Sequence, residues 1–363
     1  MYSVWLSEIY TNHTYRISDL HLIQAHLSHV KRMRFDLDNP ITTKDIPHKL
    51  RELCFGDHYN KKIGIGVLPS SIRYVSFGCL YNQKIDAGAL PSDLRFLAFG
   101  YNYNKKICAG VLPTDLRYLE FGYSYNKKIG SGVLPSDIAT LFFGRKYNQK
   151  IDVDVLPHNL GYLGFGEEYN QKIDVGVLPH SLKCLEFGED YNQKIDVGVL
   201  PPNLQYLEFG IYYDKKIEPG VLPHSLEFLS FHWKYNQQIC TNVLPYNLRC
   251  LDFGYSYNKK IDVGVLPYGL QYLTFGFEYN QKIDPGVLPQ NLRYLEFDWK
   301  YNQKIEAGVL PPSLKYLEFG EEYDQKIDTG VLPIGLDTIL FCKGYLYIAN
   351  VQLLFPGKVY TKN

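Results

Sequence analysis

The sequence has no excess of either charge, because 38 Lys and Arg side chains balance 38 Asp and Glu side chains over 363 residues. This balance argues against a general attraction to nucleic acid. No apolar run is long enough to cross a bilayer, and the segment after Met1 lacks the basic start and apolar core of a secretory signal. We therefore expect a soluble cytoplasmic protein that makes no contact with a membrane.

The sequence also lacks the spacings that mark catalytic, metal and cofactor sites. The seven cysteines form no Cys-x-x-Cys pair and stand at unlike positions, which favours reduced thiols over disulfides or a zinc site. None of the ten histidines has a Cys or a carboxylate at ligand spacing, and there is no Gly-rich phosphate loop or Gly-x-Ser-x-Gly elbow. We therefore predict that the protein is not an enzyme and holds no cofactor or metal.

What the chain does have is a repeat of 22 residues that runs from Leu50 to Phe341 without insertion or deletion. We number repeat positions from Leu50 as position 1. Each repeat opens with a Leu-x-x-Leu-x-Phe pattern, continues with an aromatic-Asn pair at positions 10 and 11 and Ile at position 14, and closes with Leu-Pro at positions 19 and 20. A fixed period of this length indicates a solenoid, in which each unit packs mainly on its neighbours.

The pattern inside one repeat predicts a mainly β fold. Apolar residues at positions 4 and 6 alternate with variable residues at 3, 5 and 7, which indicates a short strand with one buried face. Identical strands one repeat apart stack in parallel, so we expect one parallel sheet. Positions 14 and 19 then return beneath the strand, which gives five inward apolar side chains per repeat with positions 1, 4 and 6. Gly at position 17, replaced only by Asp154 and Asn242, predicts a turn with positive φ.

The Asn at position 11 is the strongest structural signal after the period itself. We expect its side-chain amide to accept hydrogen bonds from, and donate them to, backbone groups at a bend, forming a ladder along the solenoid. Asp214 and Asp324 keep only the acceptor, so we expect those two turns to be slightly weaker. The predicted ladder residues are Asn60, Asn82, Asn104, Asn126, Asn148, Asn170, Asn192, Asn236, Asn258, Asn280 and Asn302.

The ends of the array depart from the repeat, as the capping units of a solenoid do. Ser18 and Asp19 resemble a helix N-cap, and Leu20, Ile23, Leu27 and Val30 follow on one helical face. We therefore predict a short N-terminal helical cap and a degenerate first repeat, about two residues short, within residues 1–47. The repeat array then covers residues 48–341, and residues 342–363 form the C-terminal cap.

The exposed sheet face is the predicted binding surface, because aromatic side chains at position 3 stand beside carboxylates at position 5 and such mixtures suit protein interfaces. Like aromatics on neighbouring strands also stabilise a sheet by stacking, so a purely structural role remains an alternative. Trp233 and Trp299 at position 8 add a possible two-Trp grip on a partner or a sugar ring, although duplication of repeats explains their pairing equally well. The candidate residues are Tyr74, Tyr118, Glu120, Tyr162, Glu186, Tyr206, Glu208, Trp233, Tyr272, Tyr294 and Trp299.

A row of lysines at position 13 at first suggests a nucleic-acid site. Position 15 is acidic in most repeats, as in Lys84 with Asp86, and residues two apart on an extended chain share a face. We therefore interpret this row as neutralised surface charge, and we consider nucleic acid an improbable partner. Lys62 and Lys128 have no acid at position 15 of their own repeat.

The combined pattern Leu-x-x-Leu-x-Phe-Gly-x-x-Tyr-Asn-x-x-Ile-x-x-Gly-Val-Leu-Pro resembles the FNIP repeat, a short relative of the leucine-rich repeat. The resemblance spans residues 50–341, with Tyr in place of the family's Phe before Asn. It implies a leucine-rich-repeat-like solenoid with an interaction role and no chemistry. Similar proteins occur in social amoebae and in giant viruses of amoebae, so a viral chain would act in the host cytoplasm.

These observations together predict a non-enzymatic scaffold that binds another protein through the sheet face, most simply as a monomer. Two alternatives stay open. One is a glycan-binding or other ligand-binding module. The other is the substrate-recognition part of a ubiquitin-ligase adaptor without a recognisable F-box, since some similar proteins carry an F-box and the segment before Val30 is too short for one.

Overall fold

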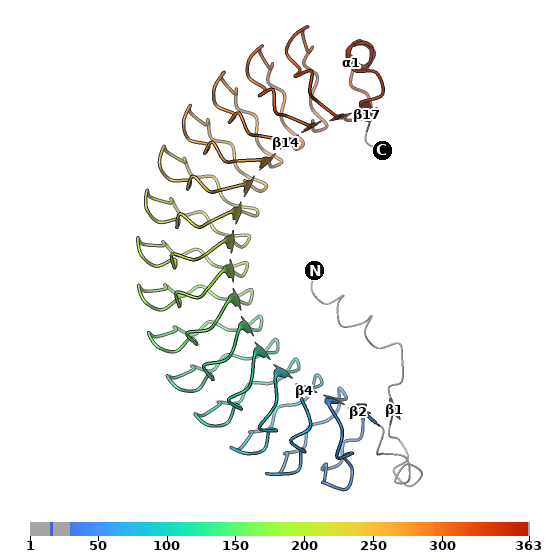
Figure 1. The fold of residues 1–363 in the computed structure, drawn as a ribbon, viewed down its shortest axis with the longest axis vertical. Coiled ribbons are helices and arrows are strands. Elements are labelled where there is room, and N and C mark those ends of the chain that lie inside the picture. Colours follow the sequence, from blue (N-terminus) through green and yellow to red (C-terminus); the bar gives the residue numbers. More distant parts are fainter. Residues whose placement is uncertain (1–14, 17–29, 362–363) are drawn as a thin grey trace. The chain divides into compact units, whose positions relative to one another are not determined.

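The computed structural model of the protein describes residues 15–16 and 30–361. The predicted N-terminal helix from Ser18 to Leu27 lies outside these residues. The chain divides into an N-terminal unit, residues 1–169, and a C-terminal unit, residues 170–363. Each unit is a stack of the same short repeat (Figure 1).

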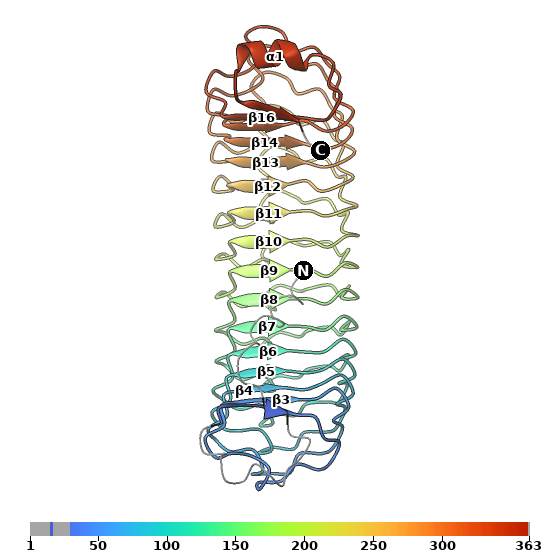
Figure 2. The same ribbon diagram turned by 90° about the vertical axis from the view of Figure 1, so that its right-hand side faces the viewer.

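Each unit contains a run of short parallel strands, one per repeat, which Figure 2 shows lying one above the other. The N-terminal unit contains β1 (Tyr15–Arg16), β2 (Arg32–Phe35), β3 (Glu52–Phe55), β4 (Tyr74–Ser76), β5 (Phe96–Ala98), β6 (Tyr118–Glu120), β7 (Thr140–Phe142) and β8 (Tyr162–Gly164). The C-terminal unit contains β9 (Cys184–Glu186), β10 (Tyr206–Glu208), β11 (Phe228–Ser230), β12 (Cys250–Asp252), β13 (Tyr272–Phe275), β14 (Tyr294–Phe297), β15 (Tyr316–Glu318), β16 (Thr338–Phe341), α1 (Ile348–Leu354) and β17 (Val359–Thr361). The predicted mainly β solenoid is confirmed.

The register of the strands follows the sequence period. Tyr206 of β10 lies opposite Phe228 of β11, 22 residues later, so equivalent positions of neighbouring repeats meet side by side. Met33 of β2 lies opposite Leu53 of β3, an offset of 20 residues, which agrees with the shortened first repeat that the sequence predicts. The pairing of β16 with β17 has the same offset of 20.

The core holds more side chains per repeat than the five that the sequence predicts. The five predicted positions are buried, but so are Tyr at position 10 in every repeat and Val at position 18 in most of them. The prediction did not include Tyr among the inward positions and was incomplete there. In the structure only the Asn of this pair stays near the surface, and the Tyr ring fills the interior.

Two aromatic columns run side by side through the core of each unit. The Tyr rings of position 10 stack on one another at centroid distances near 6.1 Å, as between Tyr235 and Tyr257. The Phe rings of position 6 form the second column, and Phe253 stacks on Tyr257 of its own repeat at 4.0 Å. These stacked rings supply much of the buried apolar surface that stabilises the array.

The turn at position 17 has the predicted backbone conformation. Its glycines have positive φ, for example +74° at Gly132, and the two exceptions, Asp154 and Asn242, have φ of 61° and 66°. Asp and Asn tolerate this region better than other side chains, which explains why these residues replace Gly there.

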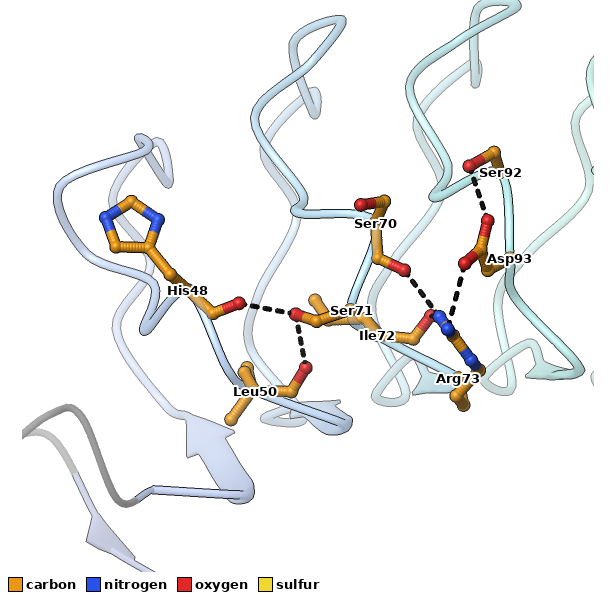
Figure 3. Close-up of polar contacts among 8 residues, drawn as sticks. All are labelled: His48, Leu50, Ser70, Ser71, Ile72, Arg73, Ser92 and Asp93. Atoms are coloured by element: carbon orange, nitrogen blue, oxygen red, sulfur yellow. Dashed lines mark hydrogen bonds and ion pairs between the residues drawn. The ribbon is translucent and has the colours of Figure 1, made fainter.

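Neighbouring repeats are also tied together at position 22, which the sequence analysis did not single out. Ser71 donates a hydrogen bond from its hydroxyl to the carbonyl oxygens of His48 and Leu50, both at 2.8 Å (Figure 3). Ser225 donates to the carbonyl oxygen of Leu204, position 1 of its own repeat, and Asn247 donates to the carbonyl oxygen of His224 in the repeat before. Nearby, Arg73 at position 2 forms an ion pair at 2.8 Å with Asp93 at position 22 of the same repeat. In these repeats a short polar side chain just before the strand ties the chain to the turn one strand earlier.

The C-terminal segment changes character after Phe341. Tyr345 keeps its place in the core, stacked on Phe341 at 4.2 Å, and its hydroxyl donates to the carbonyl oxygen of Gln325 at 2.9 Å. The helix α1 then buries Val351, whereas Leu354, which falls on an inward position of the repeat frame, is half exposed. The helical turn shifts the inward position, so the repeat frame no longer applies there.

Candidate binding surface

The sheet face, formed by the side chains of positions 3 and 5, carries most of the predicted binding residues. The position 3 rings are half-buried and stack from one strand to the next. The ring centroid of Tyr74 lies 4.2 Å from that of Phe96, and the ring centroid of Tyr206 lies 4.3 Å from that of Phe228. Tyr272 is the most exposed of them, at 47%. Tyr162 and Glu186 also lie on this face, half-buried. The alternative of a structural aromatic ladder therefore describes much of what these rings do, while their outer edges still contact solvent.

Four tyrosines on this face are hydrogen-bonded to the carboxylate two residues further along the same strand. Tyr118 donates to Glu120 at 3.0 Å and Tyr294 donates to Glu296 at 2.7 Å. Tyr206 with Glu208 and Tyr316 with Glu318 form equivalent pairs. Burial raises the pKa of Glu120, although the bond from Tyr118 opposes this. The two side chains can meet because residues two apart on a strand point to the same side of the sheet. The hydrogen bond then holds both in one orientation.

The sheet faces of the two units differ in charge. In the N-terminal unit position 5 is mostly neutral, and Glu120 is its one carboxylate among β3 to β8. In the C-terminal unit position 5 carries Glu186, Glu208, Asp252, Glu296 and Glu318. Glu186 lies opposite Glu208, and Glu296 lies opposite Glu318, on adjacent strands. Like charges opposite one another are unfavourable in a sheet, so this arrangement is not explained by stability.

The tryptophans of position 8 belong to an aromatic ridge made of Trp233, Tyr255, Phe277 and Trp299. Successive ring centroids lie 4.2, 4.5 and 5.5 Å apart, with the rings nearly parallel. Trp233 is 48% exposed and Trp299 is 38% exposed. A grip with a ligand between the two tryptophans is therefore excluded, because Tyr255 and Phe277 occupy the intervening space.

The stacking of the ridge also bears on the glycan alternative. A sugar ring binds best against the open face of an aromatic ring, but in this ridge the inner faces are covered by neighbouring rings. Along the ridge, the edges of the rings face solvent. Such a row suits the apolar side chains of a protein better than it suits a glycan.

A hollow of about 360 Å³ lies where the ridge meets the sheet face. Its polar lining comes from the two positions at which the repeat is interrupted, His232 and Asp298 in place of Gly at position 7, and from Asp252 and Thr274 at position 5. Trp233 and Tyr255 of the ridge form its apolar side. Aromatic and acidic side chains therefore share one concave site here.

The electrostatics of the hollow depend on one ion pair. Nε2 of His232 lies 2.8 Å from Oε1 of Glu208. This hydrogen bond raises the pKa of His232 and lowers the pKa of Glu208. Burial raises the pKa of Asp252, although a hydrogen bond from the backbone N–H of Gly254 opposes this.

The residues predicted as the Asn ladder form a chain of hydrogen bonds within each unit. The backbone N–H of Asn82 donates to Oδ1 of Asn60 at 3.0 Å, and this bond recurs from repeat to repeat. The Gln at position 12, where present, donates to the same oxygen, as from Gln149 to Asn126 at 2.9 Å. Asp214 accepts both bonds as well, from the N–H of Asn236 at 3.0 Å and from Gln237 at 2.8 Å. Because the ladder uses the side-chain oxygen, Asp fits it as well as Asn does, and the weaker turn expected at Asp214 has no basis in these contacts.

We expect Asn126→Ala to lower the free energy of unfolding by about 1 to 3 kcal/mol, because the half-buried N–H of Asn148 loses the acceptor that it has at 3.1 Å. Asn126→Asp keeps the acceptor and should leave stability nearly unchanged. Urea denaturation followed by circular dichroism measures both variants. Equal midpoints for the wild type and the Ala variant would show that the ladder contributes nothing.

The lysines of position 13 pair mostly with the position 15 acid of the next repeat. Lys62 binds Asp86 at 2.6 Å and Lys128 binds Asp152 at 2.7 Å. The next repeat thus supplies the acid that position 15 of their own repeat lacks. These side chains are largely exposed, so each pair contributes at most about 1 kcal/mol, but together they neutralise the row.

Over the described residues, no three His, Cys, Asp or Glu side chains gather in a way that could hold a metal ion. No helix among those residues has the length and apolar character needed to span a membrane.

The class of protein follows from this architecture. A parallel β solenoid with short repeats, inward Leu side chains and an Asn ladder is a leucine-rich-repeat-like protein. The model of the FNIP repeat matches residues 38–80, 81–124, 103–146, 147–190, 191–234, 235–278, 279–322 and 301–343, and the chain belongs to the FNIP repeat family.

Two solved structures extend the comparison, whereas no curated protein matches the chain. CroV588 of a giant virus, described as a circular leucine-rich-repeat protein, is 40% identical over 86% of this chain, with a TM-score of 0.81. The match covers 50% of CroV588, so the chain spans half the length of that relative. Drosophila Toll in its complex with Spatzle is 12% identical over 92% of this chain and 55% of its own, with a TM-score of 0.60, which shows a likeness of fold alone.

Proposed function

We propose that this protein is a non-enzymatic scaffold that binds another protein through the sheet face and the aromatic ridge of its C-terminal unit. The observation that carries the proposal is the ridge itself, four aromatic side chains in continuous contact whose outer edges face solvent. Aromatic side chains with an apolar body dominate the energetics of protein interfaces.

The rigidity of the repeats supports the same function. The backbone ladders, the core columns and the Asn bonds fix each strand relative to the next within the unit, so the surface side chains are held in place before a partner arrives. A surface ordered in advance loses less conformational entropy on binding. The likeness in fold to Toll, whose structure was solved in its complex with Spatzle, fits this proposal.

Affinity capture from a lysate of the native cells, read by mass spectrometry, tests the proposal. We expect the wild type to retain specific proteins that a variant with Tyr206, Trp233, Tyr294 and Trp299 changed to Ala does not retain. The matched control changes Tyr246 and Tyr268 to Ala, which are 65% and 71% exposed at position 21, away from this surface. Circular dichroism verifies that all variants are folded. Capture of the same proteins by the wild type and the four-residue variant would contradict the proposal.

A further inference from the structure

The ridge and the hollow form one continuous surface in the C-terminal unit. Trp233 and Tyr255 of the ridge line the hollow together with Asp252 and Asp298. A partner that covers the ring edges therefore also places a side chain next to these carboxylates. Any occupant has to match both an apolar strip and an acidic recess.

The charge beside the ridge is strongly acidic. Positions 5 and 7 of the C-terminal unit carry six carboxylates, Glu186, Glu208, Asp252, Glu296, Asp298 and Glu318, and no Lys or Arg. The tyrosines that hydrogen-bond to three of them are neutral donors, so they hold the side chains without cancelling the charge. His232, which also lines the hollow, is hydrogen-bonded to Glu208 and interacts electrostatically with Asp252.

The nearest lysines do not neutralise this row. Lys300 follows Trp299 at position 9, but its ammonium group is bound to Glu278 at 2.8 Å and lies over the ring of Phe277. Lys234 follows Trp233 at position 9 and lies outside the lining of the hollow. Among the described residues, neither of these lysines forms an ion pair with Asp252 or Asp298, the two carboxylates that line the hollow.

We propose that the ridge and the hollow bind a basic segment of a partner protein, with an arginine or lysine side chain seated in the hollow against Asp252 and Asp298. This inference rests on the proposed function and names the chemistry of its partner. Charge complementarity selects a cationic occupant and disfavours nucleic acid, whose phosphates the same carboxylates repel. The apolar ridge favours a polypeptide. Neighbouring repeats are spaced like neighbouring strands, about 4.8 Å apart, so an extended segment across four repeats contacts both the aromatic and the acidic side chains.

The repulsion between adjacent carboxylates supports the same occupant. Glu186 lies opposite Glu208, and Glu296 lies opposite the buried Glu318. Like charges that face one another on adjacent strands are unfavourable. A guanidinium or ammonium group placed between such carboxylates relieves this repulsion and gains two charge-assisted hydrogen bonds. Binding of a basic segment should therefore also stabilise the fold.

The first test is fluorescence anisotropy of a labelled deca-arginine peptide against the full chain, with a deca-glutamate peptide as the charge control. We expect the arginine peptide alone to bind, and the variant Glu208→Gln, Asp252→Asn, Asp298→Asn to bind it at least about tenfold more weakly. The matched control, Asp262→Asn, Glu306→Gln, Asp328→Asn, removes the same number of charges from exposed side chains at position 15. It should change the affinity by less than about twofold, since charges beyond a Debye length are screened.

Equal weakening by the two triple variants would overturn the inference, because it would show a general attraction of opposite charges. Failure of the wild type to bind the arginine peptide would overturn it as well. Trp233→Ala with Trp299→Ala provides an independent readout that keeps every charge. We expect this variant to weaken binding of a peptide of alternating Arg and Leu more than binding of deca-arginine, and an equal effect on both would remove the ridge from the proposed site.

A second measurement separates this inference from the proposed function. A random-peptide library is selected on the immobilised wild type, and the selected peptides are tested against the same variants. Basic peptides that lose affinity for the acidic-row variant support the inference. Neutral or acidic peptides that depend on Trp233 and Trp299 overturn the inference and leave the scaffold function standing. Selection of no peptide, together with no binding of deca-arginine, would count against both.

Discussion

Tyr257→Ala should destabilise the protein by about 3 to 5 kcal/mol, the cost of removing a large aromatic side chain from a packed core. Tyr257 is fully buried and contacts Tyr235 at 6.1 Å, Tyr279 at 6.2 Å and Phe253 at 4.0 Å. Its removal leaves a cavity in both aromatic columns at once. The midpoint of urea denaturation, followed by circular dichroism and by tryptophan fluorescence, measures the loss.

Tyr257→Phe, in contrast, should not lower the free energy of unfolding. The hydroxyl of Tyr257 is buried and has no hydrogen-bond partner among the described residues, and burial raises its pKa, so the group stays neutral. An unsatisfied buried hydroxyl costs about 1 to 3 kcal/mol, so replacing it with hydrogen should preserve or raise stability. Tyr345→Phe is the matched control, because it removes the bond to Gln325 and should lower stability by about 1 kcal/mol. A loss in Tyr257→Phe as large as that in Tyr345→Phe would contradict this account of the Tyr column.

Gly122→Ala should destabilise the protein by about 3 kcal/mol, because a methyl group at this position would overlap with the backbone of the neighbouring repeat. A Cβ on Gly122 would collide with the carbonyl group of Gly100, and neither backbone can move without disturbing the strand pairing beside it. The effect should appear in both the thermal midpoint and the urea midpoint.

The control for this prediction is Gly132→Ala, a glycine that has positive φ and no neighbouring atom within 4 Å of the added methyl group. It should cost only about 1 to 2 kcal/mol, the conformational penalty for Ala in the left-handed region. An Ala variant of Gly122 that is as stable as that of Gly132 would show that the repeats can separate at position 7.

His232 and Asp298 show how the chain accommodates larger residues at position 7. After His232 the backbone changes: Gly254 takes a φ of +65° and the N–H of Tyr255 bonds to the carbonyl oxygen of His232 at 2.6 Å. Before Asp298 the strand pairing extends by one residue, to Phe275 opposite Phe297. The same two substitutions line the hollow, so the local departure from the repeat coincides with the proposed site.

The sequence alone determined the period, the parallel stacking, the inward Leu and Ile positions and the glycine turn. These features depend on local backbone preference and on the repetition of one pattern, since equivalent residues of identical units have to meet side by side. The tie between repeats at position 22 could also have been found, because Ser, Asn and Asp predominate there.

Only the tertiary structure decided where the side chains of the loop positions point. Tyr257 and its equivalents turn into the core, while Trp233, Tyr255, Phe277 and Trp299 turn outward and stack into one ridge. Both sets are aromatic residues outside the strands, so neither composition nor alternation separates them. The direction of each side chain depends on how the chain bends between position 7 and position 11. That bend also brings Asp252 and Asp298, 46 residues apart in the sequence, to the same hollow.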